Sequence, residues 1–135
     1  MKTFRSILIF LIIIFFSYTF MNKALMFDSF LLNIAKTGLF NDFLIHVLAL
    51  TGMTMEFISI ILLALNKKWG ILVSLGMMSL FTIYIICLYL LGRYEVCGCG
   101  GIMNGLNFWS HLLINSFLII LLYYLWNSNR YEGKE

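Results

Sequence analysis

Apolar residues follow one another in four long runs that are separated by charged and turn-forming residues. The runs cover roughly residues 4–20, 46–65, 69–91 and 109–126. Each approaches the length of about 20 residues that a helix needs to cross a bilayer. The pattern therefore predicts an all-α fold, an integral membrane four-helix bundle with four transmembrane helices, in a single domain over residues 1–135.

The segment between the first two runs has a different pattern. Charged residues, Lys23, Asp28, Lys36 and Asp42, punctuate the apolar residues from position 21 to position 43. This mixture predicts short amphipathic helices lying at the membrane surface. The next connection, residues 66–68, is short enough to make the second and third spans an antiparallel hairpin.

Composition supports a lipid environment. The chain is 62% hydrophobic and 11% charged, with a mean hydropathy of +0.98, and a soluble domain of this size could not bury so much apolar surface. The start, Met1 to Arg5 followed by an apolar run, also resembles a secretory signal peptide. Because residues 17–21 lack the small-residue pattern that signal peptidase requires, we expect this run to be retained as a span.

The basic residues predict the orientation. In a four-span arrangement one side of the membrane carries Lys2, Arg5, Lys67, Lys68, Arg130 and Lys134. The positive-inside rule then places both termini in the cytoplasm and the connection after the third span on the outer side, toward a periplasm or the cell exterior. This bias accounts for most of the net charge of +3, which therefore does not indicate a nucleic acid partner.

A pair of cysteines stands in that outer connection. Cys97 and Cys99 enclose Gly98 and are followed by Gly100 and Gly101. Gly98 gives the backbone the freedom that a disulfide between such near neighbours needs. A bridge of this kind is strained and easily reduced, so the motif favours thiol-disulfide exchange and makes Cys97 and Cys99 the candidate catalytic pair.

Polar residues at the outer end of the fourth span form a second candidate group. His111 and Asn115 are four positions apart and share a helix face, and His46 begins the second span at a similar depth. One interpretation is that His111 lowers the pKa of a cysteine thiol and so acts in catalysis. Two others are a metal site with Cys97, Cys99 and His46, for which the ligand spacing is unfamiliar, and histidines bonded only to carbonyl groups.

Glu56 and Trp109 are two further candidate supporting residues, and Cys87 has a separate interpretation. Glu56 lies near the middle of the second span, so it is expected to face the bundle with Gly52 and Ser59 and to have a partner or a proton. Trp109 stands at a span end, where tryptophan anchors helices at the interface. Cys87, predicted on a face with Phe81 and Tyr84, is expected to be a small packing residue.

The chain resembles the methylamine utilisation protein MauE family, and in particular its DoxX-like redox-associated membrane proteins. The residues that carry the likeness are the Cys97 to Gly101 motif followed by Trp109, His111 and Asn115, together with Glu56 and the Phe81 and Tyr84 pair. The resemblance implies a four-helix membrane bundle that assists maturation of exported disulfide-containing proteins, in the type case the small subunit of methylamine dehydrogenase. It also implies a thioredoxin-like or other exported redox partner, and a place in the inner membrane of a bacterium with the Cys97 and Cys99 loop in the periplasm.

Two alternatives remain beside a thiol-disulfide oxidoreductase. The first is a noncatalytic membrane subunit or scaffold of a larger envelope complex, in which a Cys97 and Cys99 bridge is structural. The second is a bundle that binds a quinone, a lipid or a metal. A quinone is a candidate cofactor, but one cysteine pair plus Cys87 cannot form the two-pair relay of quinone-coupled thiol oxidases.

Overall fold

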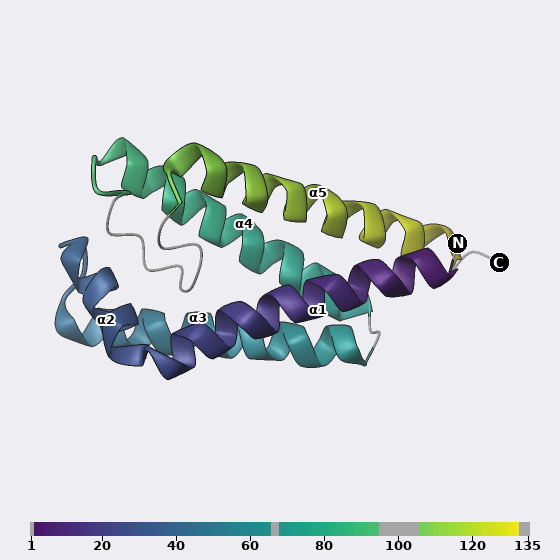
Figure 1. Cartoon of the computed structure of the whole chain (residues 1–135), viewed down its shortest axis with the longest axis horizontal. Coiled ribbons are helices and arrows are strands. Elements are labelled where there is room, and N and C mark those ends of the chain that lie inside the picture. The colour runs from purple at the N-terminus through teal and green to yellow at the C-terminus, as the bar shows by residue number, and fades with distance from the viewer. Residues whose placement is uncertain (1, 66–67, 95–105, 133–135) are drawn as a thin grey trace.

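A computed structural model of the chain describes residues 2–65, 68–94 and 106–132. Within these residues the chain forms five helices (Figure 1). They are α1 (Lys2–Leu25), α2 (Phe27–Lys36), α3 (Asp42–Ala64), α4 (Lys68–Leu90) and α5 (Phe108–Glu132). The two termini lie at one end of the bundle, and α2 lies at the other end.

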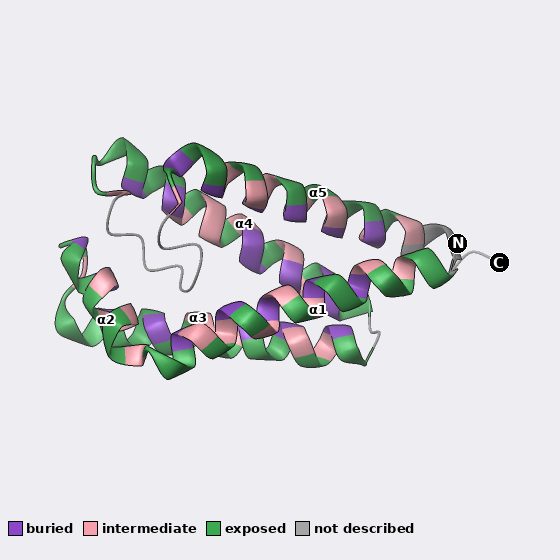
Figure 2. Cartoon of the chain, viewed as in Figure 1, coloured by how far each residue is buried: buried purple, intermediate pink, exposed green. Residues whose placement is uncertain are grey.

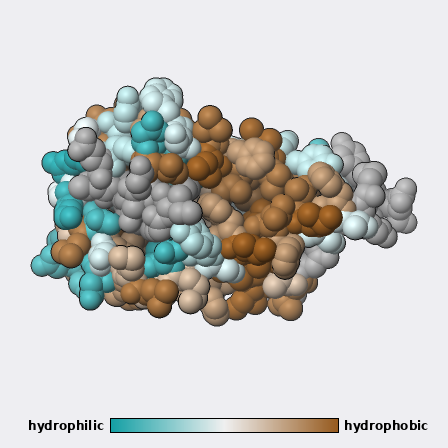
Figure 3. Space-filling view, in the orientation of Figure 1, coloured by the Kyte–Doolittle hydropathy of each residue, from teal (hydrophilic) through white to brown (hydrophobic). Residues whose placement is uncertain are grey.

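The predicted all-α membrane bundle is confirmed. Four of these helices, α1, α3, α4 and α5, are long and apolar enough to cross a membrane. Large apolar side chains cover much of their outer surface, and hydrophilic residues gather at the end where α2 lies (Figure 3). Such a surface is stable only in lipid, because apolar area of this extent is rare on soluble monomers. The chain is therefore a multi-pass membrane protein.

Local signals in the sequence explain where the helices begin and end. The side-chain oxygen of Asn41 accepts a hydrogen bond of 2.9 Å from Leu44 N and caps α3, and Asn107 caps α5 in the same way through Ser110 N. Gly92 has a φ of +68° after α4, where its conformation lets Arg93 N bond to the carbonyl of Leu88.

The segment between the first two spans differs from the prediction in one respect. Rather than ending near residue 20, α1 continues to Leu25, and this extension turns Lys23 into the bundle instead of leaving it at the membrane surface. The remainder, α2, is amphipathic as expected, because Ile34 is buried against α3 while Asp28 and Lys36 are exposed. The sequence alone missed the extension because a lysine in an apolar run indicates a boundary unless a buried partner compensates its charge.

The buried core is divided (Figure 2). At the end near the termini, apolar side chains of α1, α3, α4 and α5 form one cluster that includes Ile12, Leu63, Ile71 and Leu122. At the other end one cluster joins α2 to α3 around Ile34, Ile45 and Ala49, and a separate cluster around Ile85, Leu88 and Phe108 lies between α4 and α5. The helix pairs therefore close on each other at one end and separate at the other.

The closed end depends on a tight contact between α3 and α4. A Cβ atom added to Gly70 would lie 2.6 Å from the backbone carbonyl carbon of Leu62, closer than real Cβ atoms approach. Glycine thus allows the two helix backbones to approach this closely where α4 follows the short connection from α3.

Candidate functional site

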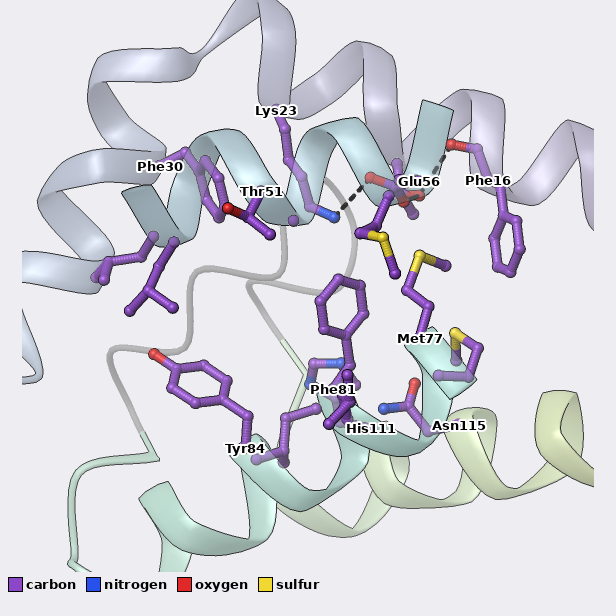
Figure 4. A pocket seen from close by; sticks show the side chains of 18 of the residues that line it. Phe16, Lys23, Phe30, Thr51, Glu56, Met77, Phe81, Tyr84, His111 and Asn115 are labelled. Carbon is purple, nitrogen blue, oxygen red and sulfur yellow. Dashed lines mark hydrogen bonds and ion pairs between the residues drawn. The ribbon is translucent and has the colours of Figure 1, made fainter. Parts of the chain in front are cut away.

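The separation of the helices leaves a cavity of about 350 Å³ that is lined by residues of all five helices. Most of its wall is apolar and includes several phenylalanines and methionines (Figure 4). The polar lining residues are Thr19, Lys23, Thr51, Glu56, Tyr84, His111 and Asn115. An apolar pocket with a few convergent polar groups, of this size, is typical of a site for a small organic molecule.

One wall carries a buried ion pair. Lys23 Nζ of α1 lies 2.9 Å from Glu56 Oε2 of α3, and the two side chains are only 6% and 2% exposed. The Thr19 hydroxyl donates a hydrogen bond to the other oxygen of Glu56. The prediction that Glu56 faces the bundle with a partner is thus confirmed, and its partner is Lys23, which we had expected at the membrane surface.

The Lys23 ammonium also lies against aromatic rings. Its Nζ is 5.2 Å from the centre of the Phe81 ring and 5.9 Å from that of Phe30. These distances are within the range of cation-π attraction, which is strongest where water is excluded. The ion pair and the two rings together stabilise the charge of the Lys23 ammonium inside the bundle.

The other wall is formed by the first turns of α5. His111 and Asn115 are 1% and 3% exposed and line the cavity on the side opposite Lys23 and Glu56, with Phe81 between them (Figure 4). The expectation that these two residues share a face is confirmed. The Asn115 side chain makes no hydrogen bond with any described residue, although it is buried.

A hydrogen-bond network at this wall joins the two ends of the connection between α4 and α5. The Tyr94 hydroxyl donates to the carbonyl of Leu106 at 3.0 Å and lies 3.0 Å from His111 Nδ1. Since a hydroxyl has one proton, Nδ1 of the neutral imidazole is the donor to Tyr94, and Nε2 is left as an acceptor. Phe108 packs edge-on against the Tyr94 ring and supports this arrangement.

A second contact crosses the bundle where the helix pairs separate. Arg93, three residues after the end of α4, donates from Nη1 to the backbone carbonyl of Thr37, directly after α2. Gly38 follows with a φ of +62°, and a Cβ there would lie 3.0 Å from the arginine. Arg93 thus ties the α4 side of the cavity to the α2 side.

Several predicted site residues lie elsewhere. His46 is exposed and its Nδ1 bonds to the carbonyl of Asp42 at 2.9 Å in its own helix, so it does not join His111. Trp109 is 67% exposed and does not line the cavity. Ser59 is buried but does not line the cavity, and its hydroxyl donates to the Met55 carbonyl at 2.8 Å.

Cys87 corrects another expectation. It is exposed on α4 rather than packed in the core, and it does not share the cavity face with Phe81 and Tyr84, which do line the cavity. Phe81 and Cys87 are six positions apart and therefore lie well out of line on α4, with Tyr84 three positions from each and angularly between them. The structure describes no group of three His, Cys, Asp or Glu side chains placed to hold a metal within residues 2–65, 68–94 and 106–132.

The cysteine motif itself lies outside the described residues, so Cys97, Cys99 and their glycines, Gly98, Gly100 and Gly101, keep the status of predictions. The residues that sequence reasoning missed are Thr19, Lys23 and Tyr94. A usable signal existed for the first two, because they are four positions apart and lie on one helix face with Phe16. Tyr94 had no comparable signal, since its partners are distant in the chain.

Comparison with known proteins supplies the family. The sequence model of the family described as methylamine utilisation protein MauE matches residues 1–127. The chain belongs to the MauE family. No curated protein and no solved structure matches the chain. The family places this protein among membrane proteins associated with methylamine utilisation, in agreement with the resemblance seen in the sequence.

Proposed function

We propose that this MauE-family protein exchanges electrons between thiols and disulfides through Cys97 and Cys99, and thereby assists the maturation of exported proteins. The observation that carries the proposal is the hydrogen bond between Tyr94 and Leu106, which holds together the two ends of the connection that contains both cysteines. An exchanging pair benefits from such support, because its rate depends on the access and orientation of the sulfur atoms. We place this connection on the periplasmic side of the bacterial inner membrane, with both termini in the cytoplasm.

The exchange proceeds in two balanced steps. The thiolate of one cysteine attacks a disulfide of an exported partner, and a mixed disulfide forms while a partner thiolate leaves. The second cysteine then attacks the mixed disulfide, so that Cys97 and Cys99 become bridged and the partner is left with two thiols. The reverse sequence oxidises the partner. A thioredoxin-like protein is the class of partner that the chemistry and the family suggest.

We infer that His111 contributes to this reaction in two ways, by positioning the cysteine connection and by accepting a thiol proton. Its Nδ1 is engaged by Tyr94, which in turn bonds to Leu106 at the far end of the cysteine connection. Nε2 is the ring nitrogen that can accept a proton from a thiol. The structural support and the proton acceptor are therefore combined in one buried side chain.

Thiol trapping in intact cells tests the proposal. The full chain carrying Cys87→Ala is treated with a membrane-impermeant maleimide, with and without a mild reductant, so that only Cys97 and Cys99 report. We expect labelling only after reduction, and we expect Cys97→Ser to trap a partner as a mixed disulfide through Cys99. Labelling from the cytoplasmic side alone, or none after reduction, contradicts the proposal and favours a noncatalytic scaffold in a larger membrane complex.

A further inference from the structure

The cavity contains polar groups for which thiol-disulfide exchange provides no use. Asn115 is 3% exposed, lines the cavity and has no hydrogen-bond partner among the described residues. Its amide therefore presents two N–H donors and one acceptor oxygen to the cavity. The nearby His111 Nε2 is an acceptor by the argument from its Tyr94 contact. This wall thus offers donors and an acceptor to a molecule inside the cavity.

The opposite wall offers donors without net charge. The Lys23 ammonium has three N–H groups, of which one donates to Glu56. The ion pair is neutral as a whole, so the cavity provides no excess charge to bind a phosphate or carboxylate headgroup. An uncharged molecule with hydrogen-bonding oxygens fits this wall better than an anionic lipid.

The cavity also reaches the lipid-facing surface. Leu48 of α3 and Leu80 of α4 line it, yet they are 41% and 62% exposed. A ligand can therefore enter sideways from the bilayer and leave an apolar tail between these side chains. An acyl chain by itself would fill this opening, but it has no polar atom that could form a hydrogen bond with the buried amide of Asn115.

We propose that the cavity binds the ring of a lipid-soluble quinone. A quinone is flat and uncharged, and it has two carbonyl oxygens on opposite sides of its ring. In the proposed pose one oxygen accepts a hydrogen bond from Lys23 and the other accepts one from Asn115, while the ring packs against Phe81, which lies between these two side chains. The volume of about 350 Å³ is in the range of pockets that hold such ligands.

The same groups also suit the reduced ligand. A quinol hydroxyl donates where a quinone carbonyl accepts, and both His111 Nε2 and the amide oxygen of Asn115 are acceptors. The site therefore has partners for both redox forms without moving a backbone element. Binding uses only described residues and does not depend on the proposed exchange at Cys97 and Cys99.

Photoaffinity labelling tests this inference. The full chain in lipid nanodiscs is labelled with an azidoquinone, unlabelled decylubiquinone is added as competitor, and the modified peptides are mapped by mass spectrometry. We expect competed labelling in the peptides that line the cavity, and affinity about tenfold lower in Asn115→Leu, as the loss of one buried hydrogen bond predicts. Asn22→Leu is the matched control, since Asn22 lies outside the cavity lining.

A second variant covers the case in which Asn115→Leu does not fold. Gly52 lines the cavity and has room for a Cβ, 3.9 Å from Phe81, so Gly52→Leu fills the space without removing a polar group. We expect it to abolish competed labelling while it retains helical circular dichroism. Three results would overturn the inference. Labelling could resist competition by decylubiquinone, it could be as strong in folded Gly52→Leu as in the unaltered protein, or it could be displaced only by added phospholipid. Because Cys97→Ser should bind quinone normally, failure of the exchange proposal is distinguishable from failure of this one.

Discussion

Replacing Lys23 with methionine leaves the Glu56 carboxylate buried without its ionic partner. Methionine keeps the length and most of the apolar stem of lysine, so the substitution tests the charge rather than the packing. Glu56 is 2% exposed, and water cannot replace the lost ammonium without opening the bundle. The Thr19 hydrogen bond to the carboxylate remains.

The expected loss in the free energy of unfolding follows from the burial of Glu56. Removing one member of a buried ion pair costs about 3 to 5 kcal/mol, because the remaining charge is uncompensated. We expect a loss of about 3 kcal/mol in the free energy of unfolding for Lys23→Met, at the low end because Thr19 still donates to Glu56. Glu56→Gln keeps only one acceptor oxygen and leaves the Lys23 ammonium buried without its counter-ion, so it is also expected to cost about 3 kcal/mol.

The double variant distinguishes the contribution of the ion pair to stability from the separate effects of replacing each side chain. With Lys23→Met and Glu56→Gln combined, no charge is left buried at this position, and the amide still bonds to Thr19. We expect this variant to be more stable than Lys23→Met alone by about 2 kcal/mol, since coupled neighbours depart from additivity by up to about 3 kcal/mol.

The assay is reversible unfolding in bicelles by titration with a denaturing detergent, followed by circular dichroism. Lys36→Met is the matched control, because Lys36 is exposed on α2 and its replacement should change stability by less than about 0.5 kcal/mol. If the double variant loses the sum of the two single losses within about 0.5 kcal/mol, Lys23 and Glu56 are not coupled and the reasoning is refuted.

Three other predictions concern the backbone contact and the two ties across the bundle. Gly70→Ala should lower the melting temperature by several degrees, because the added Cβ overlaps the α3 backbone. Gly76→Ala is the control, since no atom lies within 4 Å of its added Cβ, and it should leave the melting temperature unchanged or raise it. Equal effects of the two substitutions would contradict the close contact between Gly70 and α3. Tyr94→Phe removes the hydrogen bonds at the ends of the cysteine connection, so the alkylation rate of reduced Cys97 and Cys99 should change, and the free energy of unfolding should fall by about 1 to 2 kcal/mol. The exposed control Tyr123→Phe should leave the alkylation rate unchanged, and an unchanged rate in Tyr94→Phe would exclude a positioning role for Tyr94. Arg93→Gln should increase hydrogen exchange of the amides at the end of α2 in nanodiscs, and unaltered exchange would show that this tie is dispensable.

Residues of the candidate site could be predicted only where the sequence of a single helix indicates that the side chain faces the protein interior. Glu56, His111 and Asn115 could be selected because a polar side chain in an apolar span must face protein, and the structure places all three at the cavity. Lys23 was assigned to the membrane surface because a lysine is costly in lipid unless a partner is known. Its spacing from Thr19 was a local signal that it lies on the same helix face, but its partner Glu56 is 33 positions away in sequence and no local pattern identifies that partner.

The sequence by itself determined the helical membrane architecture, the family and the ends of several helices. The reason is that lipid requires long uninterrupted apolar segments with internally bonded backbones, and both requirements are local. The tertiary structure decided that α1 continues to Leu25 and pairs Lys23 with Glu56, that Tyr94 joins His111 to Leu106, and that the core divides around a cavity. Those features arise from the angle at which packed helices diverge, which depends on contacts between side chains far apart along the chain.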